Sequence, residues 1–226
     1  MRYKAIMADI DGTIVDSPSQ KLPSSEMRDR VAMLEKIGVQ FSVVTGRPLS
    51  FARPIIQALG LISPCITAGG TKIVDPRTEE ELWAAFIPKD SMHQLLDFVK
   101  DKPCGYLWND YTAEDYENGG WSISGFPADL PVYFFEIAYI PETEAMQFAQ
   151  TISSIPDVTV TVVIAHRPGM RDIHVTHRFA TKEHAIYKIE QILGADRSEM
   201  IGIGDGHNDL HLFAAVGHKV AMGNAV

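Results

Sequence analysis

Two aspartates, Asp9 and Asp11, stand directly after the first hydrophobic run of the chain, and Gly12-Thr13 follow them. The run over residues 5–8 predicts a short buried strand, and strand side chains two apart point to the same side. We therefore expect both carboxylates to enter one site, with Ile10 turned into the core. Two carboxylates about 4 Å apart repel by about 4 kcal/mol at an effective dielectric constant of 20. A cation, a shared proton or bulk water must offset this, which favours a metal site with a nucleophile and a proton donor.

Three further clusters of polar residues or glycine follow predicted strands: Thr45-Gly46-Arg47, Gly69-Gly70 and Asp205-Gly206. Strands and helices alternate in the first and last parts of the chain, including a helix over about 51–59 with Pro54 in its first turn. This alternation predicts an α/β fold with a doubly wound parallel sheet. Ligands bind beyond the carboxyl ends of the strands in such sheets, so the clusters can converge on one crevice.

The middle of the chain has a different pattern. Expected strands outnumber expected helices there, and several strands are consecutive, which predicts an α+β insert with an antiparallel sheet. We expect a core of residues 1–76 and 178–226 and an inserted domain of residues 77–177. The chain stops at Val226 just after an expected strand, which suggests a truncated or unresolved tail.

Composition excludes several classes of partner. The net charge of −9 over 226 residues argues against nucleic acid and anionic membranes. No apolar run approaches the ~20 residues of a spanning helix, and no signal peptide is visible, so a cytoplasmic location is expected. Cys65 and Cys104 are expected to be free thiols in a reducing compartment. The composition does not indicate an oligomeric state.

Four motifs occur in an informative order: DIDGT at 9–13, VVTGR at 43–47, Lys182 at a predicted helix start, and GDGHND at 204–209. Together they resemble the four motifs of the haloacid dehalogenase superfamily. The large insert and the closing MGNA at 222–225 resemble its Cof-like, sucrose-phosphatase-like capped branch. The resemblance covers the two core segments, and it implies a Rossmann-like core in which the insert is a cap domain.

The resemblance also implies roles for the acidic residues. Asp9 is expected to be the nucleophile that forms an aspartyl-phosphate, and Asp11 the acid that protonates the leaving alkoxide and then activates water. The implied metal is Mg²⁺, since all candidate ligands are oxygens. Its implied ligands are the side chains of Asp9 and Asp205 and the backbone carbonyl of Asp11, with Asp209 in or near the inner shell.

The remaining motif residues are expected to bind phosphate. Thr45 and Gly46 are expected to open a helix whose free N–H groups face an anion. Lys182 supplies a positive charge at a helix start, where the helix dipole disfavours a cation. Asn208 resembles an amide that contacts phosphate or orients a ligand. Arg47 matches the family pattern, but the sequence leaves open whether it contacts phosphate or forms a structural ion pair.

We therefore expect a cytoplasmic, Mg²⁺-dependent phosphatase that acts on a small phosphorylated metabolite, such as a sugar phosphate. A phosphomutase of the same family and a non-catalytic phosphate-binding protein are the alternatives. Isomerised product without free phosphate would favour the first, and tolerance of Asp11→Asn would favour the second. A receiver-like signalling module fits less well, because receivers phosphorylate an aspartate on a later strand.

Some features of the sequence stay open. Gly69 stands where the branch usually has Asn, which affects recognition of the leaving group. His207 and His211 could bind zinc, although solvated helix histidines are the simpler interpretation. Two groups in the insert could bind a leaving group, or could instead form a loop and a small core: the cations His166, Arg167, Arg171 and His174, and the aromatics Tyr106, Trp108, Tyr111, Tyr116 and Trp121.

Overall fold

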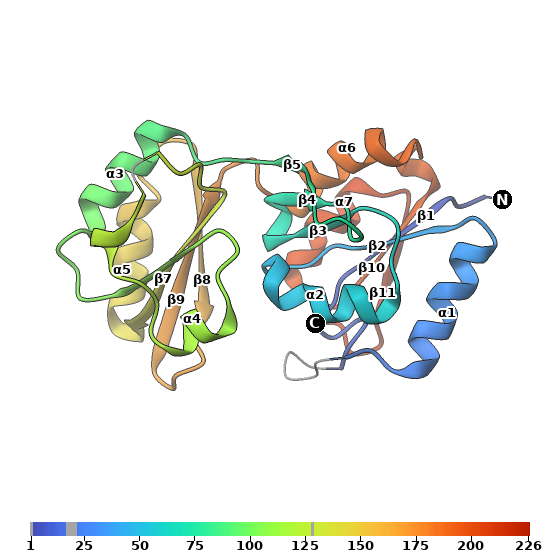
Figure 1. Ribbon diagram of the computed structural model, residues 1–226, viewed down its shortest axis with the longest axis horizontal. Coiled ribbons are helices and arrows are strands. Elements are labelled where there is room, and N and C mark those ends of the chain that lie inside the picture. The colour runs from blue at the N-terminus through green and yellow to red at the C-terminus, as the bar shows by residue number, and fades with distance from the viewer. Residues whose placement is uncertain (1, 17–21, 128) are drawn as a thin grey trace. The chain divides into compact units, whose positions relative to one another are not determined.

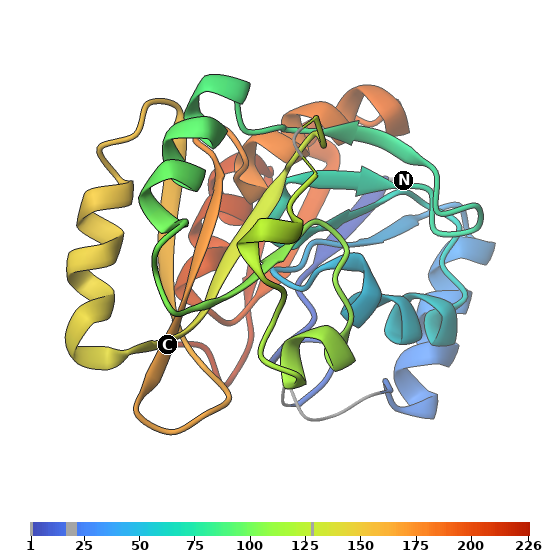
Figure 2. The same cartoon turned by 60° about the vertical axis from the view of Figure 1, so that its left-hand side comes forward.

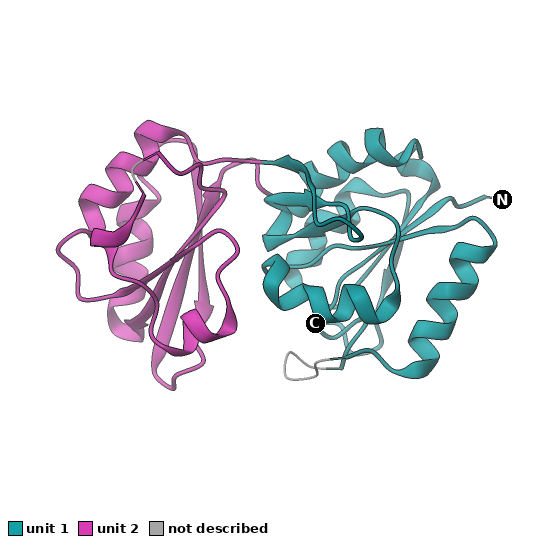
Figure 3. Cartoon of the chain, in the orientation of Figure 1, with its two compact units in different colours: residues 1–84, 181–226 teal, residues 85–180 magenta. Residues whose placement is uncertain are grey.

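The computed structural model describes residues 2–16, 22–127 and 129–226. They form two compact units, residues 1–84 with 181–226 and residues 85–180 (Figure 3). The first unit is thus made from the two ends of the chain, and the second is an insertion between them.

A four-stranded parallel sheet is the centre of the first unit, in the order β11-β10-β1-β2 (Figure 1). Its strands are β1 (Ala5–Ala8), β2 (Gln40–Val43), β10 (Met200–Gly204) and β11 (His218–Ala221). All of its pairings are parallel, which confirms the predicted α/β fold class. A parallel bridge from Val44 to Ile66 continues this sheet toward a three-stranded sheet of β3 (Cys65–Thr67), β4 (Lys72–Val74) and β5 (Glu81–Ala84).

Helices cover both faces of the parallel sheet because β1 alternates its side chains between them. Ile6 and Ala8 pack in one cluster with residues of α1 (Ser25–Lys36) and α2 (Leu49–Leu59). Ala5 and Met7 pack in another cluster with residues of α6 (Lys182–Leu193) and α7 (Leu210–Ala215). The sequence is therefore doubly wound, as its alternation predicts.

The ends of these helices follow their sequence signals, with one exception. Ser24 accepts a hydrogen bond from the N–H of Met27 at 3.1 Å and caps α1. The exception is α2, which begins at Leu49, so that Pro54 lies in the helix interior. The prediction that Pro54 occupies the first turn is wrong, because the fixed φ of Pro48 already prepares the chain for a helix.

The second unit is an antiparallel sheet in the order β6-β7-β9-β8, with helices on one face. The strands are β6 (Gly105–Trp108), β7 (Phe134–Pro141), β8 (Val158–Ile164) and β9 (Met170–His177). Helices α3 (Lys89–Val99) and α5 (Glu142–Ile152) pack their apolar sides on this sheet (Figure 2). This confirms the α+β insert, although α4 (Ala113–Glu117) was not expected from the sequence.

Short 3-10 helices complete the described chain: η1 (Ala68–Gly70), η2 (Ile123–Gly125), η3 (Arg197–Glu199) and η4 (His207–Asp209). Two of them, η1 and η4, carry the predicted glycine and acidic motifs. None of the helices in the described residues combines the length and apolar character needed to span a membrane.

Candidate active site

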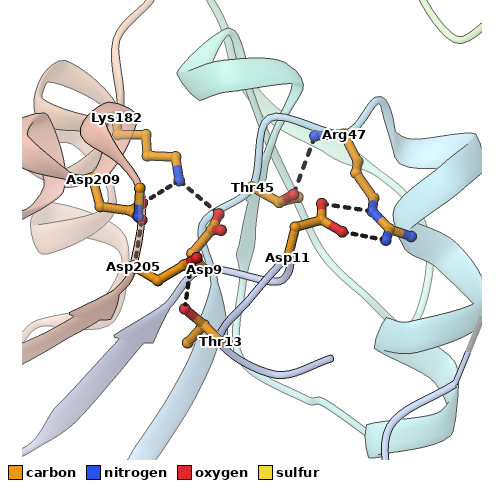
Figure 4. A network of polar contacts seen from close by, with 9 residues as sticks. Asp9, Asp11, Thr13, Thr45, Arg47, Lys182, Asp205 and Asp209 are labelled. Carbon is orange, nitrogen blue, oxygen red and sulfur yellow. Dashed lines mark hydrogen bonds and ion pairs between the residues drawn. The ribbon is translucent and has the colours of Figure 1, made fainter. Parts of the chain in front are cut away.

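Asp9 continues the alternation of β1 and therefore lies on the same side as Ala5 and Met7, toward α6. Its carboxylate accepts a hydrogen bond from Nζ of Lys182 at 2.6 Å, and the same Nζ lies 2.6 Å from Oδ1 of Asp209 (Figure 4). All three side chains are at most 6% exposed. Lys182 thus joins the end of the first strand to the GDGHND motif in a buried ion-pair network.

Lys182 reaches this position because α6 begins beside η1. The hydroxyl of Thr181 accepts a hydrogen bond from the N–H of His184 at 3.2 Å and caps the helix. A Cβ atom on Gly70 would lie 2.6 Å from the backbone nitrogen of Lys182 and 2.3 Å from the carbonyl carbon of Thr181. Only glycine fits there, so Gly70 permits the approach that places the lysine. The two carboxylates offset the unfavourable position of a cation at a helix N-terminus.

Asp9, Asp205 and Asp209 each offer a carboxylate oxygen, and these oxygens lie within 4.8 Å of one another. Acids from distant strand ends are therefore brought together, as the sequence predicts. Three carboxylates and one ammonium leave a formal charge of −3 + 1 = −2. Burial raises the pKa of Asp9 to about 6; Lys182 opposes this rise and Asp209 adds to it. A cluster of oxygens with this excess of negative charge fits a hard divalent cation.

The turn after β10 holds the two motif aspartates in different ways. Oδ2 of Asp209 accepts the N–H groups of Asp205 and Gly206, both at 3.0 Å, while its Oδ1 faces Lys182. Both oxygens of Asp209 are therefore already engaged. Asp205 instead accepts one hydrogen bond from the hydroxyl of Thr13 at 3.2 Å and a longer one from Asn224 at 3.4 Å. Asp205 has more capacity left for a ligand than Asp209.

Three residues that position Asp205 were not assigned a role from the sequence. Besides Thr13, the amide of Asn224 donates to the carbonyl of Gly12 at 3.0 Å and so links the last motif to the first. Gly12 has φ of +78°, and a Cβ atom there would lie 2.0 Å from Oδ2 of Asp205. The signal was present, because these residues belong to DIDGT and MGNA, but it indicated the family and not a contact.

The side chain of Asp11 forms its hydrogen bonds outside the cluster of Asp9, Asp205 and Asp209. Its Oδ2 accepts a hydrogen bond from Nε of Arg47 at 2.9 Å, and its Oδ1 one from Nη2 at 2.5 Å. Figure 4 shows Lys182 directed toward Asp9 and Asp209, whereas Asp11 is directed toward Arg47. Ile10 between the two aspartates is fully buried in the core, as expected.

The residues expected to bind phosphate are placed less uniformly. Thr45 is fully buried, and its hydroxyl accepts the N–H of Arg47 at 3.1 Å. The expectation that Thr45 and Gly46 open a helix is wrong, because α2 begins only at Leu49 with Pro48 as its cap. Asn208 is exposed on η4 and Gly46 is exposed in its loop, whereas Lys182 is buried.

The other candidate ligands have simpler environments. Within residues 2–16, 22–127 and 129–226, the group of possible metal ligands contains neither His207 nor His211. Nδ1 of His211 lies 4.0 Å from Glu183. Cys65 and Cys104 are free, as predicted.

The insert uses its aromatic and cationic residues within its own fold. The hydroxyl of Tyr106 donates to the carbonyl of Val99 at 2.7 Å, in the core. Trp108 packs on Trp121 with ring centroids 4.5 Å apart. Arg171 pairs with Glu142, and the guanidinium of Arg167 lies 3.9 Å from the centre of the Tyr139 ring. Arg167 and Arg171 therefore contact different partners.

Comparison with known proteins identifies the family of the chain. The family described as haloacid dehalogenase-like hydrolase matches residues 6–124 and 131–226. The chain belongs to this family, which confirms the resemblance of the four motifs. Pyridoxal phosphate phosphatase YbhA from Escherichia coli is 26% identical over 246 residues, covering 100% of this chain and 89% of that protein. HMP-PP phosphatase from Serratia proteamaculans is 25% identical over 251 residues, covering 99% and 85%.

Solved structures share the fold over the whole chain. A haloacid dehalogenase-like hydrolase from Bacteroides thetaiotaomicron has a TM-score of 0.80 at 22% identity, covering 99% of this chain and 90% of that one. A sugar phosphatase of HAD subclass IIB has a TM-score of 0.72 at 23% identity, covering 99% and 88%. At these identities the similarity establishes the fold, and the chemistry has to be argued from the residues.

Proposed function

We propose that this protein is a Mg²⁺-dependent phosphatase that hydrolyses a small phosphorylated metabolite, such as a sugar phosphate, through an aspartyl-phosphate on Asp9. One observation carries the proposal: the buried network in which Lys182 bridges Asp9 and Asp209 beside Asp205. Such a network combines a nucleophile, a fixed cation and an excess of negative charge that a metal ion can offset. The names of the relatives support phosphatase activity, and those of YbhA and the subclass IIB enzyme support a small phosphorylated substrate.

In the proposed first step, an oxygen of Asp9 attacks phosphorus and the bond from phosphorus to the leaving oxygen breaks. Asp11 gives its proton to that oxygen, so the leaving group departs as a neutral alcohol. In the second step water attacks the aspartyl-phosphate, Asp11 takes a proton from it, and the bond between phosphorus and Asp9 breaks. Inorganic phosphate leaves, and both aspartates return to their starting forms.

The proposed metal ligands are the side chains of Asp9 and Asp205 and the backbone carbonyl of Asp11. A bound Mg²⁺ would supply charge that offsets the carboxylates and orients the phosphoryl oxygens. Asp209 has both oxygens engaged, so we assign it mainly to holding Lys182 and the turn at Asp205. Lys182 holds Asp9 and the phosphoryl group together. Thr45, Gly46 and Asn208 are proposed to contribute hydrogen bonds to phosphate.

The test is phosphate release from a panel of phosphorylated metabolites, with Mg²⁺ and after chelation. We expect release only with the metal, and none from Asp9→Asn. Asp97→Asn is the matched control, because Asp97 is an exposed acid on α3. Quenching during turnover should leave one phosphoryl group on the wild type, located by mass spectrometry on the peptide that contains Asp9. Wild-type protein that releases no phosphate from any compound would refute the proposal.

A further inference from the structure

Arg47 and Asp11 form a bidentate contact next to the candidate nucleophile Asp9. Two donors of one guanidinium engage the two oxygens of one carboxylate, at 2.9 and 2.5 Å. The side chains are only 16% and 30% exposed, so water screens the pair less than it would a surface pair. A bidentate pair of this kind fixes the plane of the carboxylate as well as its distance.

The backbone on both sides of the pair is also fixed. The N–H of Arg47 donates to the hydroxyl of Thr45 at 3.1 Å, and its carbonyl accepts the N–H of Ala68 at 2.8 Å. On the other side, the N–H of Gly12 donates to the carbonyl of Val15 at 2.8 Å and closes the turn that carries Asp11. The guanidinium therefore holds the carboxylate from an anchored loop.

We propose that Arg47 is a positioning residue that orients the carboxyl group of Asp11 for proton transfer to the leaving group. The proton that Asp11 takes from solvent replaces one of the two contacts, and the other contact keeps the orientation. The inference rests on the proposed function, because it assumes that Asp11 is the acid. It also favours one of the two roles that the sequence left open for Arg47, because Nε and Nη2 of Arg47 are directed at Asp11. General acid catalysis depends on the direction and distance of the donor, so loss of orientation slows only a step that needs the proton.

The choice of leaving group separates this role from phosphate binding. An alkoxide such as that of β-glycerol phosphate needs a proton to leave, whereas p-nitrophenolate is a stable anion that leaves without one. The ratio kcat/KM reports steps up to the first irreversible one, which is cleavage of the bond to the leaving group, and excludes the later hydrolysis. We therefore compare kcat/KM for the two esters in the wild type, Arg47→Gln, Arg47→Lys, Asp11→Asn and the Arg47→Gln/Asp11→Asn double variant.

In Arg47→Gln we expect kcat/KM to fall at least about tenfold more for β-glycerol phosphate than for p-nitrophenyl phosphate, within the range that general acid catalysis contributes. Arg47→Lys should recover part of the loss, because an ammonium keeps the charge without the planar pair of donors. Arg47→Gln should add little to the loss for the alkyl ester once Asp11 is Asn, because the two residues act as one unit. Arg53→Gln is the matched control, since Arg53 on α2 forms a bidentate pair with Glu79.

Several outcomes would overturn the inference. Equal losses of kcat/KM for both esters would make Arg47 a phosphate-binding residue. No loss of kcat/KM for either ester in either Arg47 variant would make the ion pair merely structural. Additive losses in the double variant would show that Arg47 does not act through Asp11. Thermal melts distinguish these results from misfolding of Arg47→Gln, and Arg47→Lys then carries the test. A wild type that hydrolyses neither ester refutes the proposed function itself, which separates the two failures.

Discussion

The two units each bury a pair of carboxylates, but they compensate the charge differently. In the first unit, Asp9 and Asp209 share one Lys182, and Asp205 lies beside them. In the second unit, Oε2 of Glu136 accepts the hydroxyl of Tyr111 at 2.5 Å, and Oδ2 of Asp172 accepts that of Tyr116 at 2.5 Å. In the second unit each carboxylate thus has its own neutral donor, whereas in the first unit two carboxylates share one cation.

Burial raises the pKa of a carboxyl group in both units, that of Asp9 in the first and that of Asp172 in the second. For Asp9 the net result is a pKa of about 6, with Lys182 opposing the rise and Asp209 adding to it. In the second unit, burial and then the nearby carboxylates raise the pKa of Tyr111 and Tyr116, which keeps both hydroxyls protonated as donors. His174 adds a contact to Glu136 at 3.4 Å. Burial of an acid alone therefore does not mark a functional site. What separates the first unit is that three carboxylates lie within 4.8 Å of one another and two of them share one cation.

Asp9→Asn is the substitution expected to have the largest effect, and it tests this difference between the two units. We expect kcat to fall by at least about 10⁴-fold, because the amide cannot attack phosphorus. Without metal the melting temperature should not fall, since the substitution removes one of three crowded negative charges. Kinetics and calorimetry of the same preparation test both parts. Retained turnover would refute the role of Asp9, and a large loss of stability would show that the crowded acids contribute to the fold.

Lys182→Met tests the shared cation. We expect little residual activity and a loss of about 3–5 kcal/mol in the free energy of unfolding, because the substitution leaves two buried carboxylates without their compensating cation. Added Mg²⁺ should recover part of the melting temperature, since a bound divalent ion stabilises the folded state. Lys188→Met on the exposed side of α6 is the matched control. Equal melting temperatures for the two variants would contradict the role of Lys182 in charge compensation.

The sequence predicted the members of this site better than their contacts. Asp9 and Asp205 were predictable because each follows a buried strand of a parallel sheet, and such strands end at the same edge. The bidentate pair of Asp11 with Arg47 was not, because it depends on how two loops fold against each other. The hydrogen bond from the amide of Asn224 to the carbonyl of Gly12 depends on a turn at the end of β11. The prediction that a helix begins at Thr45 was wrong, because Pro48 determines where α2 begins.

The second unit was predictable as a class but not in detail. Alternating apolar residues indicated its strands, and consecutive strands indicated antiparallel pairing. The sequence gives no periodic signal for α4, a helix of five residues whose start is fixed by Thr112 and Asp115. The pairing of Tyr111 with Glu136 joins the segment before α4 to a central strand. Contacts of that kind follow from tertiary packing, which local patterns do not encode.

Tyr111→Phe sharpens the comparison from the side of the second unit. We expect the free energy of unfolding to fall by about 1–3 kcal/mol, because the buried carboxylate of Glu136 loses its hydroxyl donor. Glu136→Gln should cost less, since the amide oxygen still accepts the Tyr111 hydroxyl and no buried charge is left. Denaturant unfolding of the two variants measures both losses. A larger loss for Glu136→Gln would mean that the charge on Glu136 stabilises this unit.

The smallest expected effect is the reactivity of the two thiols, one in each unit. Burial raises the pKa of Cys65 to about 12, and burial also raises the pKa of the half-buried Cys104. The thiolate is the reactive form, so at pH 8 only about one Cys65 in 10⁴ is reactive even before access is considered. Alkylation of the native protein should therefore be slow for both thiols, and slower for Cys65. Its rate should rise with pH toward the pKa, and unfolding in denaturant should make both fast.

Mass spectrometry of peptides after timed alkylation with iodoacetamide separates the two sites. Because Cys65 is fully buried on β3, its modification requires the first unit to open. Mg²⁺ that binds the carboxylates of this unit should slow alkylation of Cys65 and leave that of Cys104 in the second unit unchanged. Equal slowing at both thiols would show that the two units open together. The two units would then differ in how their buried charges are compensated but not in their stability.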